Sequence, residues 1–390
     1  MTGSRPEVLI IGGGVIGTSI AFHLARQSVR VTLVEEKDLA SGSSGACDGL
    51  IFMQSKKPGI HLEMALKSLE RFQELSRILP VPLEFRQTGG MVVIETEEEY
   101  RAMEAYARDQ RSIGLDVSIL DRDQAIQKEP GLSPDILGAA WSPLDGQVNP
   151  MGLTLGFALA AKKAGVRILS RTRVLDLVFQ NNRVIGVETG RGRFFGDVVV
   201  NACGAGSAGI AAMAGLSLPV KPRKGQIVVT RAARPMISHC MISAKYIAAK
   251  YNPDLAREAG EGLSIEQTEN GNLLLGSTRE FAGFDTRNTL EGIRTILQNT
   301  SRVVPGIQNL EMIRSFAGLR PWTPDGLPLL GPVRGLEGFF MAAGHEGDGI
   351  ALSPVTGNLV SKMILEHPLE FSMEPFSPDR FLDSKEGSHG

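Results

Sequence analysis

The sequence has little of several features that would indicate particular classes of protein. It holds three cysteines in 390 residues, Cys47, Cys203 and Cys240, which stand far apart. They form no CxxC pair and show no metal-ligand spacing, which argues against enzymes with a redox-active cysteine pair and predicts no metal site. We expect each thiol to be a small, inert, buried group.

Charge of one sign and long apolar runs are also scarce. The net charge is −2, so no basic field favours nucleic acid or an anionic membrane. The stretch Val198 to Val220 carries no charge, but its asparagine, proline, serines and glycines are unlike a lipid-facing helix of roughly 20 residues. The first apolar run begins at about residue 7, which leaves no room for a signal peptide. We expect no nucleic-acid partner, no transmembrane segment and a cytoplasmic location.

Glycine, by contrast, is abundant, with 45 residues, and its first cluster stands between two apolar runs. Residues 8–11 predict a buried strand, Gly12-x-Gly14-x-x-Gly17 a tight turn, and the helical spacing of Ile16, Ile20 and Leu24 a helix. A second run, 29–34, predicts another strand and ends at Glu35. The order of strand, glycine turn, helix, strand and acid is the dinucleotide-binding fingerprint.

Each part of the fingerprint has a physical role. Gly12 makes the sharp turn, Gly14 leaves room for a pyrophosphate, and Gly17 lets the helix pack closely on the strands. The unpaired N–H groups and the dipole at the start of the helix favour the negative phosphates. Glu35 is placed to accept hydrogen bonds from ribose hydroxyls. We therefore predict that this part of the chain binds a dinucleotide.

Small residues continue in the loop 41–49, Ser-Gly-Ser-Ser-Gly-Ala-Cys-Asp-Gly. Such a loop suits N–H and O–H donation to a phosphate or ribitol chain, and the alternative is a flexible surface loop. A second glycine turn at 201–207 follows a predicted strand at 198–201 and can approach the same ligand. The pair Lys56-Lys57 is interpreted as a solvated turn rather than as an oxygen-activating or partner-facing feature.

Further elements follow from spacing and capping residues. Helical spacing is found at 62–79, Thr96 opens a helix that ends near Gly114, and Asn149 with Pro150 opens one that ends near Gly165. Strands are predicted at 166–169, 174–179 and 184–188. A mostly β module spans 219–318, with strands at 226–230, 237–242, 246–250, 263–267 and 272–276, a charged insertion at 251–262 and a helix at 289–303. Ser353 and Pro354 are expected to cap a closing helix that stops before Pro368, and the tail beyond about residue 372 is expected to be mobile.

Together these segments resemble the D-amino-acid oxidase family of flavoproteins, which includes glycine oxidase and sarcosine oxidase. The matching segments are GGGVIG with VTLVEE, SGSSGA, DGQVNP, VVVNACGAGS, GLRPWTPDGLPLLGP and AAGHEGDGI. Residues 49–59 look most like the β subunits of heteromeric opine, hydroxyproline and cyanide-forming glycine dehydrogenases. An NAD-dependent dehydrogenase would explain the N-terminal fingerprint but not the two C-terminal segments.

The resemblance implies a mixed α/β fold, with a Rossmann-type FAD-binding domain and a discontinuous, mainly antiparallel-sheet substrate domain. The FAD-binding domain would comprise 1–80, 147–218 and 319–368, the substrate domain 81–146 and 219–318, and the C-terminal tail 369–390. FAD would be bound non-covalently, since Cys47 does not match an attachment position. The implied cofactor-binding residues are Gly12, Gly14, Val15, Ile16, Gly17, Glu35, Glu36, Ser43, Ser44, Gly45, Ala46, Gly49, Leu50, Val174, Ala202, Cys203, Gly204, Gly344, His345, Gly347, Asp348, Gly349 and Ile350.

The family reaction moves a hydride from the carbon beside an amine to flavin N5. Arg320 is the candidate anchor for the substrate carboxylate, because a planar guanidinium pairs with a carboxylate through two hydrogen bonds. Tyr246 is expected to donate to that carboxylate, and Met53 and Gln54 to line the substrate face. His345 is placed beside flavin or substrate rather than as an obligatory base, since an amine can lose its proton on binding.

Three functions stay open at this point. The first is an amino-acid dehydrogenase that passes electrons to a partner subunit. Such an enzyme would be part of a hetero-oligomer, and opine catabolism or a position beside a membrane would suit it. The second is a self-sufficient oxidase that uses oxygen, and the third is a non-catalytic flavin-binding scaffold. Glycine, sarcosine, proline derivatives and opines all carry a carboxylate and an α-amine. An opine would need a second carboxylate site, for which Arg223, Lys224 or Lys245 offers a charge.

Overall fold

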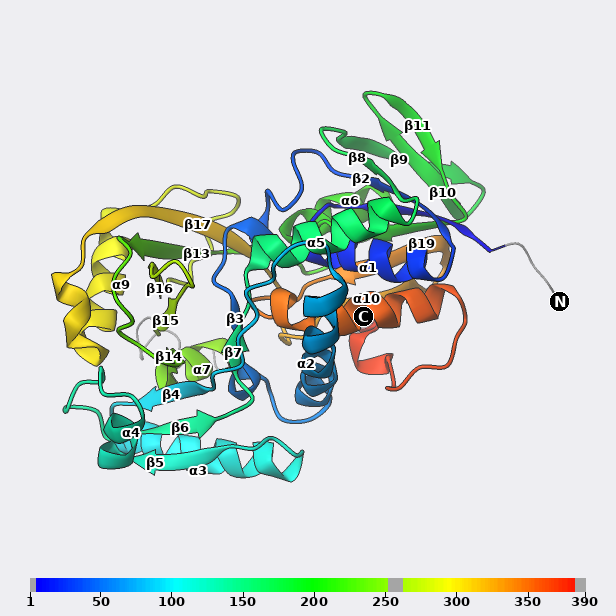
Figure 1. The fold of residues 1–390 in the computed structure, drawn as a ribbon. Coiled ribbons are helices and arrows are strands. Elements are labelled where there is room, and N and C mark those ends of the chain that lie inside the picture. Colours follow the sequence, from blue (N-terminus) through cyan, green and yellow to red (C-terminus); the bar gives the residue numbers. More distant parts are fainter. Residues whose placement is uncertain (1–4, 252–261, 383–390) are drawn as a thin grey trace, which may run out of the picture.

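Two large β-sheets lie side by side in the computed structural model, which describes residues 5–251 and 262–382 (Figure 1). A short antiparallel pair, β3 (Leu50–Ile51) with β7 (Gly146–Gln147), lies between them. Ten residues of the predicted charged insertion, 252–261, lie outside the described residues. The mixed α/β class expected from the sequence is confirmed.

The first sheet has nine strands, and its centre is parallel. The order is β11-β10-β19-β12-β1-β2-β8, with β18 added beside β19 and β9 beside β10. Its strands are β1 (Glu7–Ile11), β2 (Arg30–Val34), β8 (Arg167–Leu169), β9 (Val174–Gln180), β10 (Arg183–Thr189), β11 (Gly192–Phe195), β12 (Val198–Asn201), β18 (Leu329–Val333) and β19 (Leu336–Ala343). In register, Ile11 pairs with Val34 on one side and with Asn201 on the other, so the ends of three strands meet at the glycine turn.

Helices cover this sheet because its strands are apolar on both faces. Alternate residues of β1 enter different cores: Val8 and Ile10 join one cluster, and Leu9 and Ile11 another. The first cluster lies under α1 (Val15–Arg26), α2 (Ile60–Ile78), α5 (Pro150–Lys163) and α10 (Gly349–Ile364), and the second includes α6 (Ser207–Met213). Figure 1 shows α1 between α5 and α10.

The second sheet has eight strands and is mainly antiparallel, in the order β17-β13-β16-β15-β14-β4-β6-β5. Its strands are β4 (Gly90–Ile94), β5 (Ser118–Asp121), β6 (Gly138–Ser142), β13 (Lys221–Thr230), β14 (Cys240–Ser243), β15 (Ser264–Gln267), β16 (Leu273–Gly276) and β17 (Met312–Trp322). The helices beside it are α3 (Glu97–Ser112), α4 (Arg122–Lys128), α7 (Ala244–Tyr251) and α9 (Leu290–Val303). The domain boundaries given above stay a prediction.

Several helix starts agree with the predicted capping residues. The side chain of Thr96 accepts a hydrogen bond from the Glu99 N–H, and that of Asn149 from the Gly152 N–H, so α3 and α5 begin where expected. Thr289 caps α9 in the same way. The uncharged stretch from Val198 forms strand β12, a short turn and helix α6. Within the described residues, no helix combines the length and the apolar character needed to span a membrane.

Three local predictions were wrong. Residues 246–250 are helical in α7 rather than a strand: the Ser243 hydroxyl accepts from the Tyr246 N–H, and alanine and lysine favour a helix. The closing helix α10 begins at Gly349, before Ser353, and it contains Pro354. Ser353 Oγ donates to the Ile350 carbonyl, the acceptor that a proline nitrogen cannot use.

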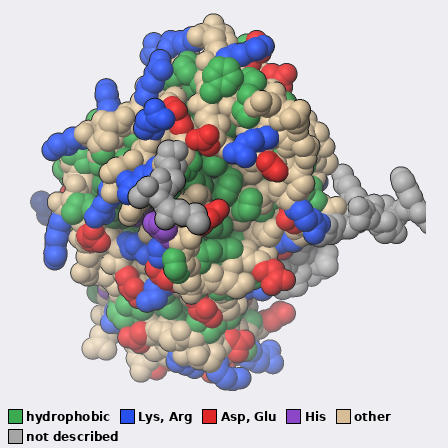
Figure 2. Space-filling view, turned by 90° about the vertical axis from the view of Figure 1, so that its right-hand side faces the viewer, with side chains coloured by type: hydrophobic (Ala, Val, Ile, Leu, Met, Phe, Trp, Pro, Cys, Tyr) green, Lys and Arg blue, Asp and Glu red, His purple; other side chains and the backbone are tan. Residues whose placement is uncertain are grey.

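The third error concerns the tail. Residues 373–382 pack against the rest of the protein, because Phe376 is fully buried and Arg380 forms an ion pair of 2.7 Å with Asp325. Residues 383–390 lie outside the described part. Elsewhere on the surface, positive and negative side chains are interspersed on the face drawn in Figure 2, in keeping with the small net charge.

Candidate functional site

The glycine turn packs so closely that side chains cannot be added to it. Gly12 has φ of +112°, and a Cβ there would lie 2.5 Å from the Ala202 carbonyl oxygen. A Cβ at Gly17 would lie 2.0 Å from the Gly12 oxygen. Helix α1 therefore starts directly against the carboxyl ends of β1 and β12, and it is capped by Gly14 without a side-chain hydrogen bond. This edge is where ligands bind in parallel α/β sheets.

Glu35 and the small-residue loop surround this turn. The Glu35 carboxylate accepts hydrogen bonds from the Gly13 N–H at 2.7 Å and the Lys37 N–H at 2.9 Å. Ser44 Oγ accepts from the Val15 N–H at 3.0 Å, so the loop 41–46 lies over the start of α1. Glu36 points away and lies 3.8 Å from Arg173 in an exposed ion pair.

Two further predicted segments meet at the same edge. The Thr172 N–H donates to the Glu35 carbonyl, which places the start of β9, and with it Val174, beside Glu35. The Ala202 N–H donates to the Ile11 carbonyl at 2.8 Å, and Cys203 Sγ lies 3.3 Å from the same oxygen. A backbone cradle, a helix N-terminus and one carboxylate thus converge, and this donor set fits the phosphates and ribose of a dinucleotide.

The start of α10 is held by a buried ion-pair cluster. Asp348, which precedes the first residue of the helix, lies 2.9 Å from Lys56 Nζ and 3.3 Å from His61 Nε2, and all three side chains are buried. Lys56 also donates to the Phe52 carbonyl at 2.7 Å and to Ser55 Oγ at 2.9 Å. The interpretation of Lys56-Lys57 as a solvated turn was therefore wrong for Lys56 and holds for the exposed Lys57.

His345 lies in the same region and is buried. Its Nε2 lies 3.1 Å from the Thr356 hydroxyl. Burial lowers the pKa of His345 to about 3, although the nearby Asp348 carboxylate opposes this shift. The imidazole is therefore neutral at physiological pH and a weak proton acceptor.

Arg320 is fixed on β17 by neutral partners. Its guanidinium donates to the Thr278 carbonyl at 3.1 Å and to Ser277 Oγ at 3.0 Å. A Cβ at Gly225 on the neighbouring strand β13 would lie 2.2 Å from Nη1, so this glycine makes room for the group. Burial opposes its charge, but Glu346, Tyr246 and Asp48 outweigh burial and raise the pKa of Arg320. It is a fixed cation.

Tyr246 and Arg320 face a common point beside Gly347. A Cβ added to Gly347 would lie 3.6 Å from the Tyr246 hydroxyl oxygen and 3.7 Å from Arg320 Nε. Burial raises the pKa of Tyr246, so its hydroxyl stays protonated and able to donate. The structure therefore brings together the two residues predicted to hold a carboxylate, next to the start of α10.

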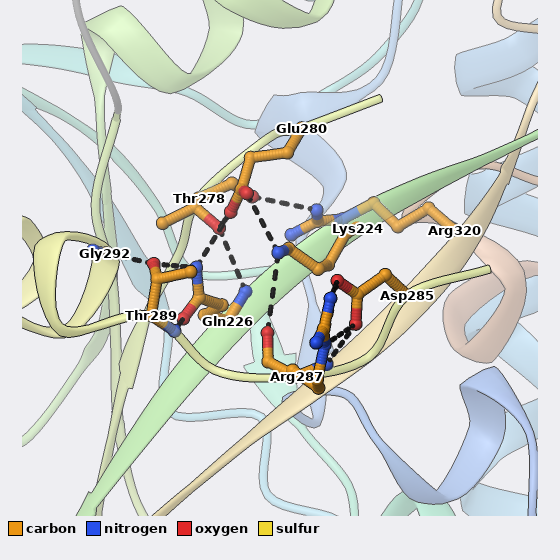
Figure 3. Close-up of polar contacts among 9 residues, drawn as sticks. All are labelled: Lys224, Gln226, Thr278, Glu280, Asp285, Arg287, Thr289, Gly292 and Arg320. Carbon is orange, nitrogen blue, oxygen red and sulfur yellow. Dashed lines mark hydrogen bonds and ion pairs between the residues drawn. The ribbon is translucent and has the colours of Figure 1, made fainter. Parts of the chain in front are cut away.

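A polar network behind Arg320 fixes the segment that holds it (Figure 3). The Glu280 carboxylate accepts from Lys224 at 2.9 Å, from Gln226 at 2.8 Å and from the Thr278 hydroxyl at 2.8 Å. Lys224 also donates to the Arg287 carbonyl. Lys224 is therefore a support of the Thr278 segment. Its charge is therefore not available to bind a ligand.

Met53 and Gln54 contact other residues. Both are fully buried, and the Gln54 amide donates to Asp145 at 2.6 Å and to the Gly90 carbonyl at 3.0 Å. Burial raises the pKa of Asp145 to about 7. Within the described residues, Gln54 forms no hydrogen bond with Arg320 or Tyr246, and a position on the substrate face stays a prediction for Met53 and Gln54.

Sequence reasoning missed two carboxylates as site candidates, Asp48 within the loop 41–49 and Glu266 beside it. Ser264 Oγ donates to Asp48 at 3.2 Å, and the Gly49 N–H donates to Glu266 at 2.9 Å. Burial raises the pKa of both, that of Glu266 to about 8 with the help of Asp48. No motif marks Glu266, because only the pairing of β15 with its neighbours brings it to this loop.

The turn, the acid and the start of α10 define a dinucleotide-binding oxidoreductase fold. The family model described as "FAD dependent oxidoreductase" (DAO) matches residues 7–363, and the chain belongs to this family of FAD-dependent enzymes. The resemblance found in the sequence and the FAD cofactor are thereby confirmed. Whether FAD is bound non-covalently is not tested by this match and stays a prediction.

Individual relatives align over nearly the full length. Glycine oxidase of Geobacillus kaustophilus is 33% identical over 97% of this chain and 98% of its own, and its crystal structure superposes with a TM-score of 0.88. Hydrogen cyanide synthase subunit HcnC of Pseudomonas aeruginosa is 32% identical over 96% of both chains. The L-proline dehydrogenase structure from P. horikoshii has a TM-score of 0.89 at 28% identity, covering 97% of this chain and 98% of that one.

Proposed function

We propose that the chain oxidises the C–N bond of an amino acid or a secondary amino acid and passes the electrons to a partner subunit. FAD, when bound at the glycine turn and the start of α10, supplies the hydride acceptor. Gly12, Gly14 and Gly17 would receive its pyrophosphate, and Glu35 its ribose. The proposal covers glycine, sarcosine, D-proline, hydroxyproline and opine substrates.

The observation that supports this proposal most strongly is the position of Arg320. Two of its donors are engaged by Thr278 and Ser277, and a guanidinium has five N–H groups. The remaining donors can bind a substrate carboxylate, and the protonated Tyr246 hydroxyl adds another. Anchoring the carboxylate at two points fixes the adjacent α-carbon and its amine.

Removal of the proton from the substrate amine does not require a strong base among the residues of the site. His345, with a pKa of about 3, stays neutral and can accept or donate a hydrogen bond but does not hold a proton at neutral pH. The substrate amine would lose its proton to solvent on binding. The N-terminus of α10, with Gly347 and Gly349, would favour negative charge at the adjoining edge of the bound cofactor.

The relatives support two fates for the electrons. HcnC is named as a subunit of hydrogen cyanide synthase, which supports transfer to a partner chain. A self-sufficient oxidase is the second candidate, because glycine oxidase is similarly related, at 33% identity. A non-catalytic scaffold would have no need for a carboxylate anchor, so the fixed Arg320 supports catalysis.

The deciding measurement is the absorbance spectrum of the purified, flavin-loaded chain with glycine, sarcosine, D-proline, hydroxyproline, octopine and nopaline. Each compound is added with and without oxygen. We expect flavin bleaching that persists in air, as in a dehydrogenase waiting for its partner. Bleaching only in the absence of oxygen would show an oxidase. If no compound bleaches a yellow protein, the catalytic proposal fails and the scaffold is favoured.

A further inference from the structure

Within the described residues, the guanidinium of Arg279 has neither a hydrogen-bond acceptor nor an ion-pair partner. Its guanidinium carbon lies 3.8 Å above the ring centroid of Tyr246. Its Nε and both Nη atoms are buried and have no hydrogen-bond partner among residues 5–251 and 262–382. A face-on contact with a tyrosine ring stabilises a guanidinium through the negative face of the ring. It leaves all five N–H donors unused, which is costly for a buried charged group.

The position of Arg279 is fixed although its head is unpaired. It follows Thr278, whose carbonyl accepts from Arg320, and precedes Glu280, which accepts from Lys224 and Gln226 (Figure 3). The backbone on both sides is therefore tied to the network behind Arg320. A side chain held in place over Tyr246, with its donors free, is a preorganised anion site.

The other two cations suggested for a second carboxylate are engaged. Lys245 lies 3.8 Å from Glu95 and 4.0 Å from Glu99. Arg223 forms a buried ion pair of 3.3 Å with Glu346. In the described part of the chain, neither Arg279 nor Arg320 has a carboxylate within ion-pair distance, so neither guanidinium has a direct anionic partner there.

The charged groups around Tyr246 are consistent with an anion-binding site at Arg279 and Arg320. Burial lowers the pKa of Arg223 to about 10, with Arg279 and Arg320 contributing to the same direction. Burial raises the pKa of Asp48, whereas the nearby Arg320 and Arg279 lower it. Arg223, Arg279 and Arg320 thus lie in the same region as two carboxylates, Glu346 and Asp48.

We infer that Arg279 binds a second carboxylate of the substrate, so that the enzyme is selective for amino acids with two carboxylates. Arg320 and the Tyr246 hydroxyl hold the first carboxylate, and Arg279, on the ring of the same tyrosine, holds the second. The second carboxylate can be on a substituent of the nitrogen, as in N-carboxyalkyl amino acids, or on the side chain, as in aspartate and glutamate. This inference rests on the proposed function for the reaction itself.

The first test is a binding titration that does not depend on turnover. Glutarate and butyrate, which have no amine to oxidise, are titrated against the flavin-loaded protein, and the flavin absorbance change gives each Kd. We expect glutarate to bind more tightly than butyrate, and Arg279→Gln to weaken glutarate about 10- to 100-fold with butyrate changed less than about twofold. Arg287→Gln is the matched control, because that side chain is exposed and paired with Asp285.

The second test is steady-state kinetics with three groups of substrates: monocarboxylic amino acids, N-carboxyalkyl amino acids, and aspartate or glutamate of either hand. Arg279→Gln should raise KM for one dicarboxylic group about tenfold more than it changes KM for the monocarboxylic group. The group affected tells where the second carboxylate is attached. Equal losses for all groups, or equal binding of glutarate and butyrate, would overturn the inference. Absence of bleaching by every amino acid would instead reject the proposed function.

Discussion

Replacing Lys56 by methionine should be among the most destabilising single changes in the protein. Lys56 Nζ has three short contacts, with Asp348 at 2.9 Å, the Phe52 carbonyl at 2.7 Å and Ser55 Oγ at 2.9 Å. Methionine fills similar space but removes the lysine cation from the Asp348 carboxylate, which is 3% exposed and keeps His61 as a neighbour. Breaking a buried ion pair from one side costs about 3–5 kcal/mol. We expect Lys56→Met to lower the free energy of unfolding by that amount.

The neighbouring lysine provides the control. Lys57→Met removes the same charge from an exposed position and should change the free energy of unfolding by less than about 0.5 kcal/mol. Both are compared by urea unfolding at a fixed FAD concentration. Adding Asp348→Asn to Lys56→Met should recover part of the loss, because the buried carboxylate that has lost its lysine is then removed. If Lys56→Met and Lys57→Met unfold alike, the account of this cluster is wrong.

Three further predictions concern the cofactor and pH. Gly17→Ala should abolish the yellow colour of the purified protein, since its Cβ would meet the Gly12 oxygen at 2.0 Å, whereas Gly42→Ala, with nothing within 4 Å, should keep it. Acid precipitation should release all flavin into the supernatant, and flavin left on the pellet would contradict non-covalent binding. Because burial raises the pKa of Glu266 to about 8, the folded state binds more protons than the unfolded one between roughly pH 4.5 and 8. Stability therefore falls as pH rises through this range. Glu266→Gln should make the urea midpoint less dependent on pH there, and an unchanged slope would argue against the raised pKa.

Local sequence predicted the parts of the fold whose causes are local. The glycine turn, the strands on either side and the caps at Thr96 and Asn149 each depend on a few consecutive residues, and the structure has them as expected. The strand predicted at 246–250 was wrong because a short apolar run is compatible with either a strand or a helix, and the Ser243 hydroxyl accepts from the first turn of α7. Helix α10 begins directly after Asp348, ahead of the serine and proline that were expected to cap it.

The candidate site was predictable only where one segment carries it. Arg320 stands in a long motif, but the cation beside it that has no hydrogen-bond partner within the described ranges is Arg279, from a segment without a recognisable signal. Lys224 carries the same charge on the strand paired with that of Arg320, yet Glu280 neutralises it. Lys56 and Lys57 are adjacent in the chain and differ completely in burial. Pairing of charges across distant segments is decided by the tertiary fold, and a local pattern does not contain it.

The order of strands in the first sheet has a consequence for synthesis on the ribosome. β1 is made first and lies near the centre, yet its neighbour β12 pairs with β19, which ends at Ala343. A nascent chain that has emerged only as far as β17 has the glycine turn but neither β19 nor α10, and α10 packs on α1. The cofactor site is therefore completed only after β19 and α10 have been made. Until then, the edge of β12 that pairs with β19 is open to pairing with other strands.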